Sequence, residues 1–188
     1  NILLNNEVKY DELVDYDFVI VATYVDNNSF LDDVPLSKKP YQFEVCEKLV
    51  LSLPSEFNNL SVVIIDGPFM CIDPFGQTGN FVMGNVKHAV LNREIGTSIS
   101  TEDKYRQVLN KGVVKNPPFT NFKKMIDSAS QYFNGIQKAE HIGSMFTIRT
   151  VLPFRDHDDA RPTTVEQIND RLITVFSGKI PTCINAAN

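Results

Sequence analysis

Residues 172–187 read LITVFSGKIPTCINAA and combine a strand, a glycine turn and the start of a helix. The run from Leu172 to Phe176 is short, apolar and rich in β-branched residues, which is typical of a strand. Gly178 allows the backbone to approach a ligand closely, and Pro181 stands in the first turn of the predicted helix. Free amide groups and the positive end of a helix suit an anionic or electron-rich ligand.

Two further strands are predicted in the first third of the chain. The apolar run FVIVA, from Phe18 to Ala22, is typical of a strand buried on both faces. From Gln42 to Leu53 apolar and polar residues alternate, which predicts a long strand with one solvent-exposed face. Glu47 breaks this alternation and indicates a bulge or a wet patch on the covered face.

Short strands and turns follow at close spacing. Residues 61–66 (SVVIID) and 69–73 (FMCID) are predicted strands separated by a Gly-Pro turn pair. Residues 74–79 form another turn and lead into a strand over residues 80–87. Together with the strand from Gln42 to Leu53, these runs predict an antiparallel meander.

The second half of the sequence contains the helical patterns. Ser100 and Asp103 resemble a capping box, and Gly112 ends the predicted turn. A longer helix is predicted from about Asn121, with one apolar face that packs on the meander. That face consists of Phe122, Met125, Ile126, Ala129, Phe133 and Ile136. A strand around residues 145–152 follows, and then a polar stretch.

Composition excludes several classes of function. The 23 acidic residues exceed the 18 basic ones, giving a formal net charge of −5, and no segment concentrates Lys and Arg. We therefore expect no nucleic-acid partner. No apolar run approaches the roughly 20 residues of a membrane span, and no secretory signal precedes the first strand. We expect a soluble, cytoplasmic protein without a membrane span, and the start at Asn1 suggests a fragment or a processed chain.

No metal site and no hydrolase motif is predicted. The cysteines are odd in number and widely spaced, which favours small buried hydrophobes over disulfides or a metal site. They are Cys46, Cys71 and Cys183. The spacing of His141 and His157 fits no metal motif, and Asp156, Asp158 and Asp159 lack the spacing of a calcium loop, so that a solvated loop is the better interpretation. A Gly-x-Ser-x-Gly elbow is absent from the sequence.

Four segments resemble a known family. LITVFSGKIPTCINAA is similar to the flavin-binding return segment in which a strand ends in a Gly-Lys-Leu/Ile-x-Thr turn. IRTVLPFRDHDDARPTT (148–164) resembles an Arg-bearing strand, an acidic loop and an Arg-Pro pair, YDFVIVATY (16–24) the strand that leaves the cofactor domain, and DGPFMCIDPFGQTGNFVMGNV (66–86) the substrate-domain strands and hairpin. The family is the glycerol-3-phosphate dehydrogenase and D-amino-acid oxidase superfamily of FAD-dependent oxidoreductases, of which this chain resembles the C-terminal portion.

This resemblance implies a fold and a reaction. The expected fold class is α+β, a mostly antiparallel sheet with helices on one side, attached to the remnant of an FAD-binding α/β unit. Residues 1–40 and 153–188 would form that remnant, and residues 41–152 the substrate (cap) domain. The reaction implied is hydride transfer from a small anionic alcohol or amine to FAD. The alternative is a non-catalytic binding module that keeps the substrate-domain fold without cofactor.

The resemblance also implies site residues. Those expected to line the flavin ring edge are Ser177, Gly178, Lys179, Ile180 and Thr182. Arg149 matches the arginine that anchors the anionic group of the substrate, a role that suits its bidentate fork, while pairing with Asp156 or Asp158 is the alternative. Lys179 could instead extend to solvent. His88 could act as an acid or base beside the flavin, although a lone His beside apolar residues is more often structural.

The sequence departs from the family at three points. Tyr24 stands where many relatives have Gly, and Thr150 follows Arg149 where the glycerol-3-phosphate dehydrogenases have Pro. None of the nine glycines forms the GxGxxG pattern that grips a pyrophosphate. We therefore expect FAD in the intact protein, together with an N-terminal FAD-binding segment that this chain lacks.

Overall fold

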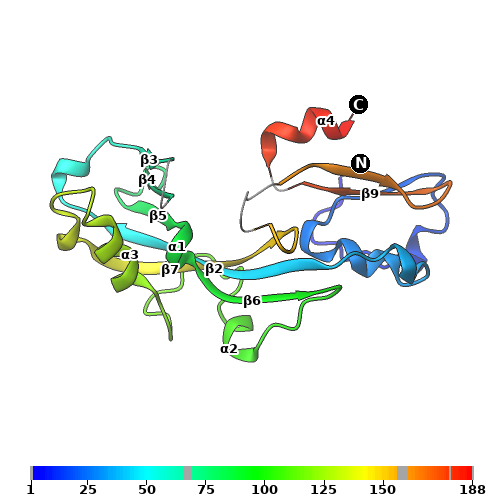
Figure 1. Cartoon of the computed structure of the whole chain (residues 1–188), viewed down its shortest axis with the longest axis horizontal. Coiled ribbons are helices and arrows are strands. Elements are labelled where there is room, and N and C mark those ends of the chain that lie inside the picture. The colour runs from blue at the N-terminus through cyan, green and yellow to red at the C-terminus, as the bar shows by residue number, and fades with distance from the viewer. Residues whose placement is uncertain (1, 66–68, 156–160, 178, 188) are drawn as a thin grey trace. The chain divides into compact units, whose positions relative to one another are not determined.

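The computed structural model divides the chain into two compact units (Figure 1). The first unit comprises Asn1–Phe43, Glu94–Ile99 and Thr150–Asn188, and the second comprises Glu44–Arg93 and Ser100–Arg149. The residues described are 2–65, 69–155, 161–177 and 179–187. Mostly antiparallel strands and a few short helices make up the structure, so the predicted α+β class is confirmed. The roles predicted for residues 1–40, 41–152 and 153–188 remain predictions.

A six-stranded sheet organises the second unit, in the order β3-β4-β5-β2-β6, with β7 also paired to β2. Its strands are β2 (Tyr41–Ser52), β3 (Val62–Ile64), β4 (Met70–Pro74), β5 (Phe81–Asn85), β6 (Val90–Gly96) and β7 (Glu140–Val151). The pairs β3 with β4, β4 with β5 and β2 with β5 are antiparallel. The meander is thus confirmed for β3, β4 and β5, whereas β2 pairs with β5 and not with β3. Residues 66–68, which include the Gly-Pro turn pair, lie outside the described residues.

The predicted solvent-exposed face of β2 is wrong. Glu44 and Glu47 expose only 1% and 2% of their surface, and of the strand's residues only Lys48 is exposed. Burial of both carboxylates is tolerated because each is paired with donors from other parts of the chain, as described below. Alternation of polar and apolar residues therefore predicted the position of the strand correctly, but not the burial of its polar side chains.

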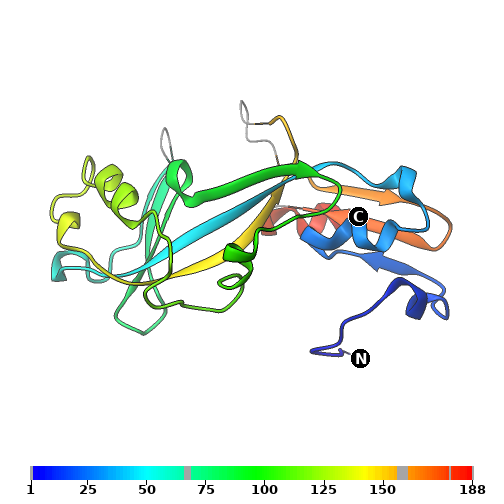
Figure 2. The ribbon, with the colours of Figure 1, turned by 90° about the horizontal axis from the view of Figure 1, so that it is seen from below.

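Helix α3 (Phe122–Ala129) packs on the sheet as predicted (Figure 2). Its buried residues Met125, Ile126 and Ala129 join the main core. From the sheet this core takes Leu49, Leu51, Met70, Ile72, Phe81 and Met83. The helix is shorter than predicted, since it ends at Ala129. After Gly135, which has a left-handed φ of 88°, a separate 3-10 turn, η5 (Ile136–Lys138), places Ile136 in the same core.

The other two α-helices in the described part of this unit are single turns. They are α1 (Val86–Ala89) and α2 (Asp103–Arg106). The capping box predicted at Ser100 is wrong, because α2 begins after Glu102, which makes no side-chain cap. Tyr105 of α2 and Val108, just after it, are buried.

The first unit contains a three-stranded sheet in the order β1-β9-β8. Strand β1 (Val19–Val21) pairs parallel with β9 (Leu172–Phe176), which pairs antiparallel with β8 (Thr164–Gln167). A small core forms around Val21, Leu31 and Leu172. The prediction that β1 is buried on both faces is wrong, since Ile20 is 66% exposed. Strand β8 lies within the stretch that had no predicted structure.

Short helices complete both units. They are η1 (Tyr10–Leu13), η2 (Tyr24–Leu31), η3 (Pro35–Ser37), η4 (Ser55–Phe57), η6 (Ile180–Thr182) and α4 (Cys183–Ala187). Among the described residues, no helix has the length and apolar character needed to cross a membrane. The cysteines are not all buried as predicted: Cys183 is exposed, and Cys46 and Cys71 are half-buried.

Candidate functional site

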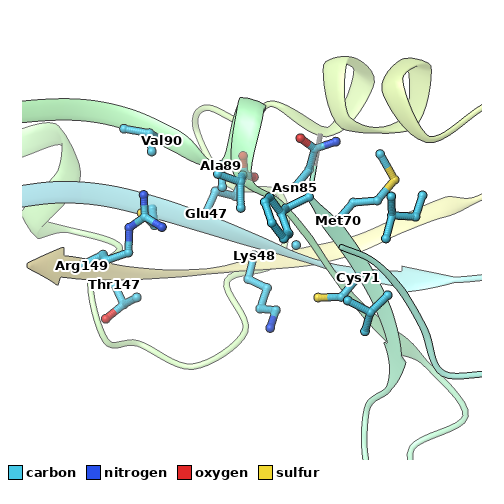
Figure 3. A pocket seen from close by; sticks show the side chains of 15 residues that line it. Glu47, Lys48, Met70, Cys71, Asn85, Ala89, Val90, Thr147 and Arg149 are labelled. Carbon is cyan, nitrogen blue, oxygen red and sulfur yellow. The ribbon is translucent and has the colours of Figure 1, made fainter. Parts of the chain in front are cut away.

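A cavity of about 330 Å³ lies within the second unit (Figure 3). Strands β2, β3, β4, β5, β6 and β7 contribute to its lining, together with the α1 turn. Most of the lining side chains are apolar, and three of them, Val63, Phe69 and Val86, are about half exposed. The volume falls within the range of about 300–1,000 Å³ that is usual for small-molecule sites. We therefore take this cavity as the candidate binding site of the unit.

Gly84 of β5 lies in the lining of this cavity, between neighbouring strands. The strand register places Val63 opposite Cys71 and Cys71 opposite Gly84. A Cβ on Gly84 would lie 3.3 Å from Cys71 Sγ and 3.5 Å from Lys48 Cε. The side chains of the two neighbouring strands thus close over this position, and a larger residue would force Cys71 to shift. Sequence reasoning missed Gly84, although a glycine inside a strand is a known signal of close approach.

Arg149 lines this cavity and is held by Glu44. Its Nε donates to Glu44 Oε2 at 2.6 Å, and its Nη2 lies 2.5 Å from the same oxygen. Arg93 Nη2 lies 3.0 Å from Glu44 Oε1, so both arginines share one buried carboxylate. Asp156 and Asp158, the partners considered in the alternative interpretation, lie outside the described residues. The assignment of Arg149 as a substrate anchor stays a prediction.

Glu47 also belongs to the lining, but its carboxylate is engaged elsewhere. Oε1 accepts hydrogen bonds from Thr120 Oγ1 at 2.5 Å and from Ser144 Oγ at 2.6 Å, and Oε2 accepts one from the Asn121 amide at 2.7 Å. Ser144 Oγ also lies 2.9 Å from His141 Nε2. In Figure 3 the carboxylate of Glu47 and the ammonium end of Lys48 point to opposite sides of the sheet. The buried acid thus fixes the segment before α3.

His88 is not one of the described residues that line this cavity. Its neighbours Val86 and Ala89 do line it. The imidazole is half-buried, and the His88 carbonyl accepts a hydrogen bond from Asn121 Nδ2 at 2.8 Å. Burial lowers the pKa of His88, and the positive charges of Lys87 and Lys124 lower it further. The structure therefore does not bring His88 and Arg149 into one cavity, and the catalytic role of His88 stays a prediction.

The predicted flavin-facing corner belongs to the first unit. Three hydroxyl groups meet there: Thr163 Oγ1 lies 2.9 Å from Ser177 Oγ and 2.5 Å from Thr182 Oγ1, and the latter two are 2.8 Å apart. The Lys179 amide donates to Ser177 Oγ at 3.3 Å, so this amide is not free as the sequence suggested.

The remaining parts of the corner are less regular than predicted. The side chain of Lys179 is exposed, and α4 has only 5 residues. The turn η6 begins at Ile180 and includes Thr182, while Gly178 lies outside the described residues. This group of residues and Arg149 therefore belong to different units. Their flavin-binding role stays a prediction.

Tyr24 has the backbone conformation of a glycine. Its φ is 60°, in the left-handed region that Gly adopts without strain. The cost is offset by the phenol, which donates to the Thr150 carbonyl at 2.7 Å and accepts from the Thr150 amide at 3.0 Å. The ring also stacks on Phe176 at a centroid distance of 5.8 Å. The two departures from the family pattern, Tyr24 and Thr150, are thus in direct contact.

No group of three or more His, Cys, Asp or Glu side chains among the described residues could hold a metal ion. His157, Asp156, Asp158 and Asp159 lie outside the described residues. His141 is engaged with Ser144 and stacks on Phe122 at 4.9 Å.

Comparison with known proteins gives a likeness in structure. No protein-family model and no curated protein matches the sequence. The structure is similar to that of glycine oxidase from Geobacillus kaustophilus, with a TM-score of 0.54 and 14% identity over 90% of this chain and 38% of the oxidase. It is also similar to iminodiacetate oxidase from Chelativorans sp. BNC1, with a TM-score of 0.51 and 14% identity over 90% of this chain and 39% of that enzyme. The chain therefore has the fold of a part of these oxidases and spans less than two fifths of their length.

Proposed function

We propose that this chain is the C-terminal, substrate-side portion of a flavin-dependent oxidoreductase that removes hydride from a small anionic amine or alcohol. The observation that carries the proposal is the shared fold with two amine oxidases over 90% of the chain. Glycine and iminodiacetate are both small amines that bear carboxylates. The sequence resemblance to the D-amino-acid oxidase superfamily supports the same class of reaction independently of the structural likeness.

Arg149 is the proposed anchor for the anionic group of the substrate. Its guanidinium lines the cavity, and Glu44 receives the hydrogen bond from Nε, which fixes the plane of the fork. A guanidinium held in one plane binds a carboxylate with less loss of side-chain entropy than a mobile one. The pair with Glu44 thus supports a positioning function for the buried acid.

FAD is the proposed cofactor of the intact protein, in which it accepts the hydride. The corner of the first unit fits the edge of a flavin ring in one respect: Lys179 presents an exposed cation beside a set of hydroxyls that hold the turn. Ser177, Thr182, Gly178 and Ile180 complete the proposed contact. Because the sequence lacks GxGxxG, an N-terminal segment is proposed to hold the pyrophosphate.

The proposed roles in binding cofactor and substrate are divided between segments of the sequence. Residues 1–40 and 153–188 would contribute to the cofactor side, and residues 41–152 would cover the substrate. His88 is retained as a proposed acid or base, since a lowered pKa keeps its imidazole neutral and able to accept a proton at neutral pH.

An anaerobic titration tests this function. The protein isolated from its native source, with the residues that naturally flank this chain, is mixed with glycine, iminodiacetate or glycerol 3-phosphate while the flavin absorbance is recorded. We expect bleaching by at least one of these compounds. Arg149→Met should raise the substrate concentration that gives half-maximal bleaching by tenfold or more, as expected on losing about 1.4 kcal/mol or more of binding free energy. Arg93→Met is the matched control, because Arg93 contacts the same Glu44 but does not line the cavity. Bound flavin that no anionic amine or alcohol bleaches would contradict the proposal and favour a non-catalytic binding module.

A further inference from the structure

We propose that Cys71 and Lys48 form an oxidation-sensitive pair: a hydroperoxide converts the thiol to a sulfenic acid, and the lysine amine then closes a sulfur–nitrogen bridge. The bridge would join β4 to β2 over Gly84, on the face of the sheet that lines the cavity. This modification site requires neither flavin nor turnover, so it is independent of the proposed oxidoreductase function.

The strand register places the two residues in one row. Cys71 lies opposite Gly84, and Lys48 is the next residue in that row, since Leu49 pairs with Met83. Side chains in such a row point to the same face of a sheet, and two strand spacings, about 10 Å in all, separate the backbones of Cys71 and Lys48. Gly84 stands between them without a side chain, so nothing keeps the two side chains apart.

Both side chains bend over Gly84. Cys71 Sγ lies 3.3 Å and Lys48 Cε 3.5 Å from the position that a Cβ on Gly84 would occupy. In Figure 3 the sulfur of Cys71 points toward the Lys48 side chain, and both lie on the same side of the sheet. The sulfur and the carbon that bears the ammonium group thus approach one point from opposite strands. The flexible stem of lysine allows Nζ to turn toward the sulfur.

The pair can be reached by a small reagent. Cys71 is half-buried and Lys48 is exposed, and both line the cavity of about 330 Å³, which a hydroperoxide is small enough to enter. None of the described acids forms an ion pair with Lys48. No carboxylate of the described residues therefore holds the lysine away from the sulfur.

The bridge forms in two balanced steps. The Cys71 thiol releases its proton to solvent, the sulfur attacks one oxygen of the hydroperoxide, the O–O bond breaks, and the Lys48 ammonium gives a proton to the leaving oxygen. The neutral amine then attacks the sulfenic sulfur, the S–O bond breaks, and the hydroxyl group leaves as water with a proton from the amine. Sulfur is oxidised and the peroxide is reduced, and the protein loses two hydrogen atoms in total.

The other two cysteines are internal comparisons. Cys46 lines the same cavity but stands on β2 itself, whereas the stem of Lys48 leans away from β2 over Gly84. Cys183 is exposed and belongs to the first unit, so its oxidation reports the strength of the reagent and not the pair. Only Cys71 is expected to become linked to Lys48.

Peptide mapping after oxidation detects the bridge. The protein with its natural flanking residues is treated with hydrogen peroxide, the remaining thiols are blocked with N-ethylmaleimide, and the chain is cleaved after glutamate. This cleavage places Lys48 in peptide 48–56, Cys71 in peptide 57–94, and Cys46 in a third peptide. We expect the first two peptides to be linked, with a mass two hydrogens below their sum, and to separate on reduction with dithiothreitol.

Variants test the role of the amine. Lys48→Met should abolish the linked peptide and leave Cys71 as a sulfenic acid that dimedone traps. Lys48→Arg keeps a cation but lacks the amine, so it should also abolish the link. Lys87→Met is the matched control, because Lys87 is exposed in the same unit but lies outside the lining, and it should leave the amount of linked peptide unchanged.

Unfolding tests the role of proximity. Urea added before the peroxide separates the three strands, so the yield of linked peptide should fall by at least about tenfold. Four outcomes overturn the inference: oxidised Cys71 without a linked peptide, an equal yield after unfolding, a link from Lys48 to Cys46 in place of Cys71, or a Cys71 that stays reduced while Cys183 is oxidised. None of these outcomes bears on flavin binding, so the oxidoreductase proposal would stand in each case.

Discussion

Arg149 Nε donates a hydrogen bond of 2.6 Å to Glu44 Oε2, joining two residues that lie 105 positions apart in the chain. The Glu44 side chain is 1% exposed and the Arg149 side chain 25% exposed, so bulk water screens the pair only partly. Arg93 reaches the other carboxylate oxygen. The arginine predicted to bind substrate is therefore oriented by an acid that the sequence pattern placed on a wet strand face.

A double-mutant cycle measures this relationship. Arg149→Met and Glu44→Gln, alone and combined, are compared by urea denaturation. We expect a coupling free energy of about 1.5–3 kcal/mol, the usual contribution of a hydrogen bond between charged groups, because each single change leaves the other partner poorly paired. Additive effects of the two changes would show that the pair does not orient Arg149.

Glu47 is expected to stabilise the second unit. Glu47→Gln replaces one of the two acceptor oxygens with an NH₂ group, which then faces either the Asn121 amide or the hydroxyls of Thr120 and Ser144. We therefore expect a loss of about 2–4 kcal/mol in the free energy of unfolding. Glu140→Gln is the matched control, since Glu140 is exposed at the start of β7. Equal denaturation midpoints for the two variants would contradict the account of Glu47.

Tyr24 is expected to stabilise the first unit through its hydroxyl group. Tyr24→Phe leaves both the amide and the carbonyl of Thr150 without the phenol, and Thr150 is 0% exposed. We expect a loss of about 1–3 kcal/mol, the cost of unsatisfied buried polar groups. Thermal denaturation of the variants measures this loss. Tyr16→Phe, at a position that is 59% exposed, is the control and should leave the melting temperature unchanged.

His88 is expected to make stability depend on pH. Burial and the charges of Lys87 and Lys124 hold its pKa below the ordinary 6.5, so the unfolded chain takes up the proton more readily than the folded one. The stability from neutral His88 is present above pH 6.5 and is lost as the pH falls through the folded pKa. Proton NMR of the imidazole should give a pKa below 6.5. His88→Gln should flatten the dependence of the urea midpoint between about pH 5 and pH 8. An unshifted imidazole pKa would exclude this environment.

Strand and helix positions could be predicted where one periodicity dominates. The apolar spacing of Met125, Ile126 and Ala129 located α3 and the face that it buries. The run from Leu172 to Phe176 is β9 itself. Such patterns depend only on local backbone geometry and on which face is buried, and both can be read from the spacing of apolar residues in a single sequence.

Features set by distant partners could not be predicted. Glu44 and Glu47 read as solvent-exposed because a sequence does not show that Arg93 or Ser144 will lie beside them. Strand β8 contains the polar residues Glu166 and Gln167, so its sequence does not read as a strand. It becomes recognisable only through its pairing with β9. For the same reason the close packing at Gly84 could not be predicted, since Cys71 and Lys48 lie beside it only after three strands pair.

The flavin content of the intact protein tests the central proposal most directly. The protein is isolated from its native source with its natural flanking residues, and its visible absorption spectrum and native mass are recorded. We predict a flavin band and a mass increase equal to one FAD per protein. Pure protein that shows neither, and that takes up no FAD when the cofactor is added in excess, would contradict the assignment to a flavin-dependent oxidoreductase.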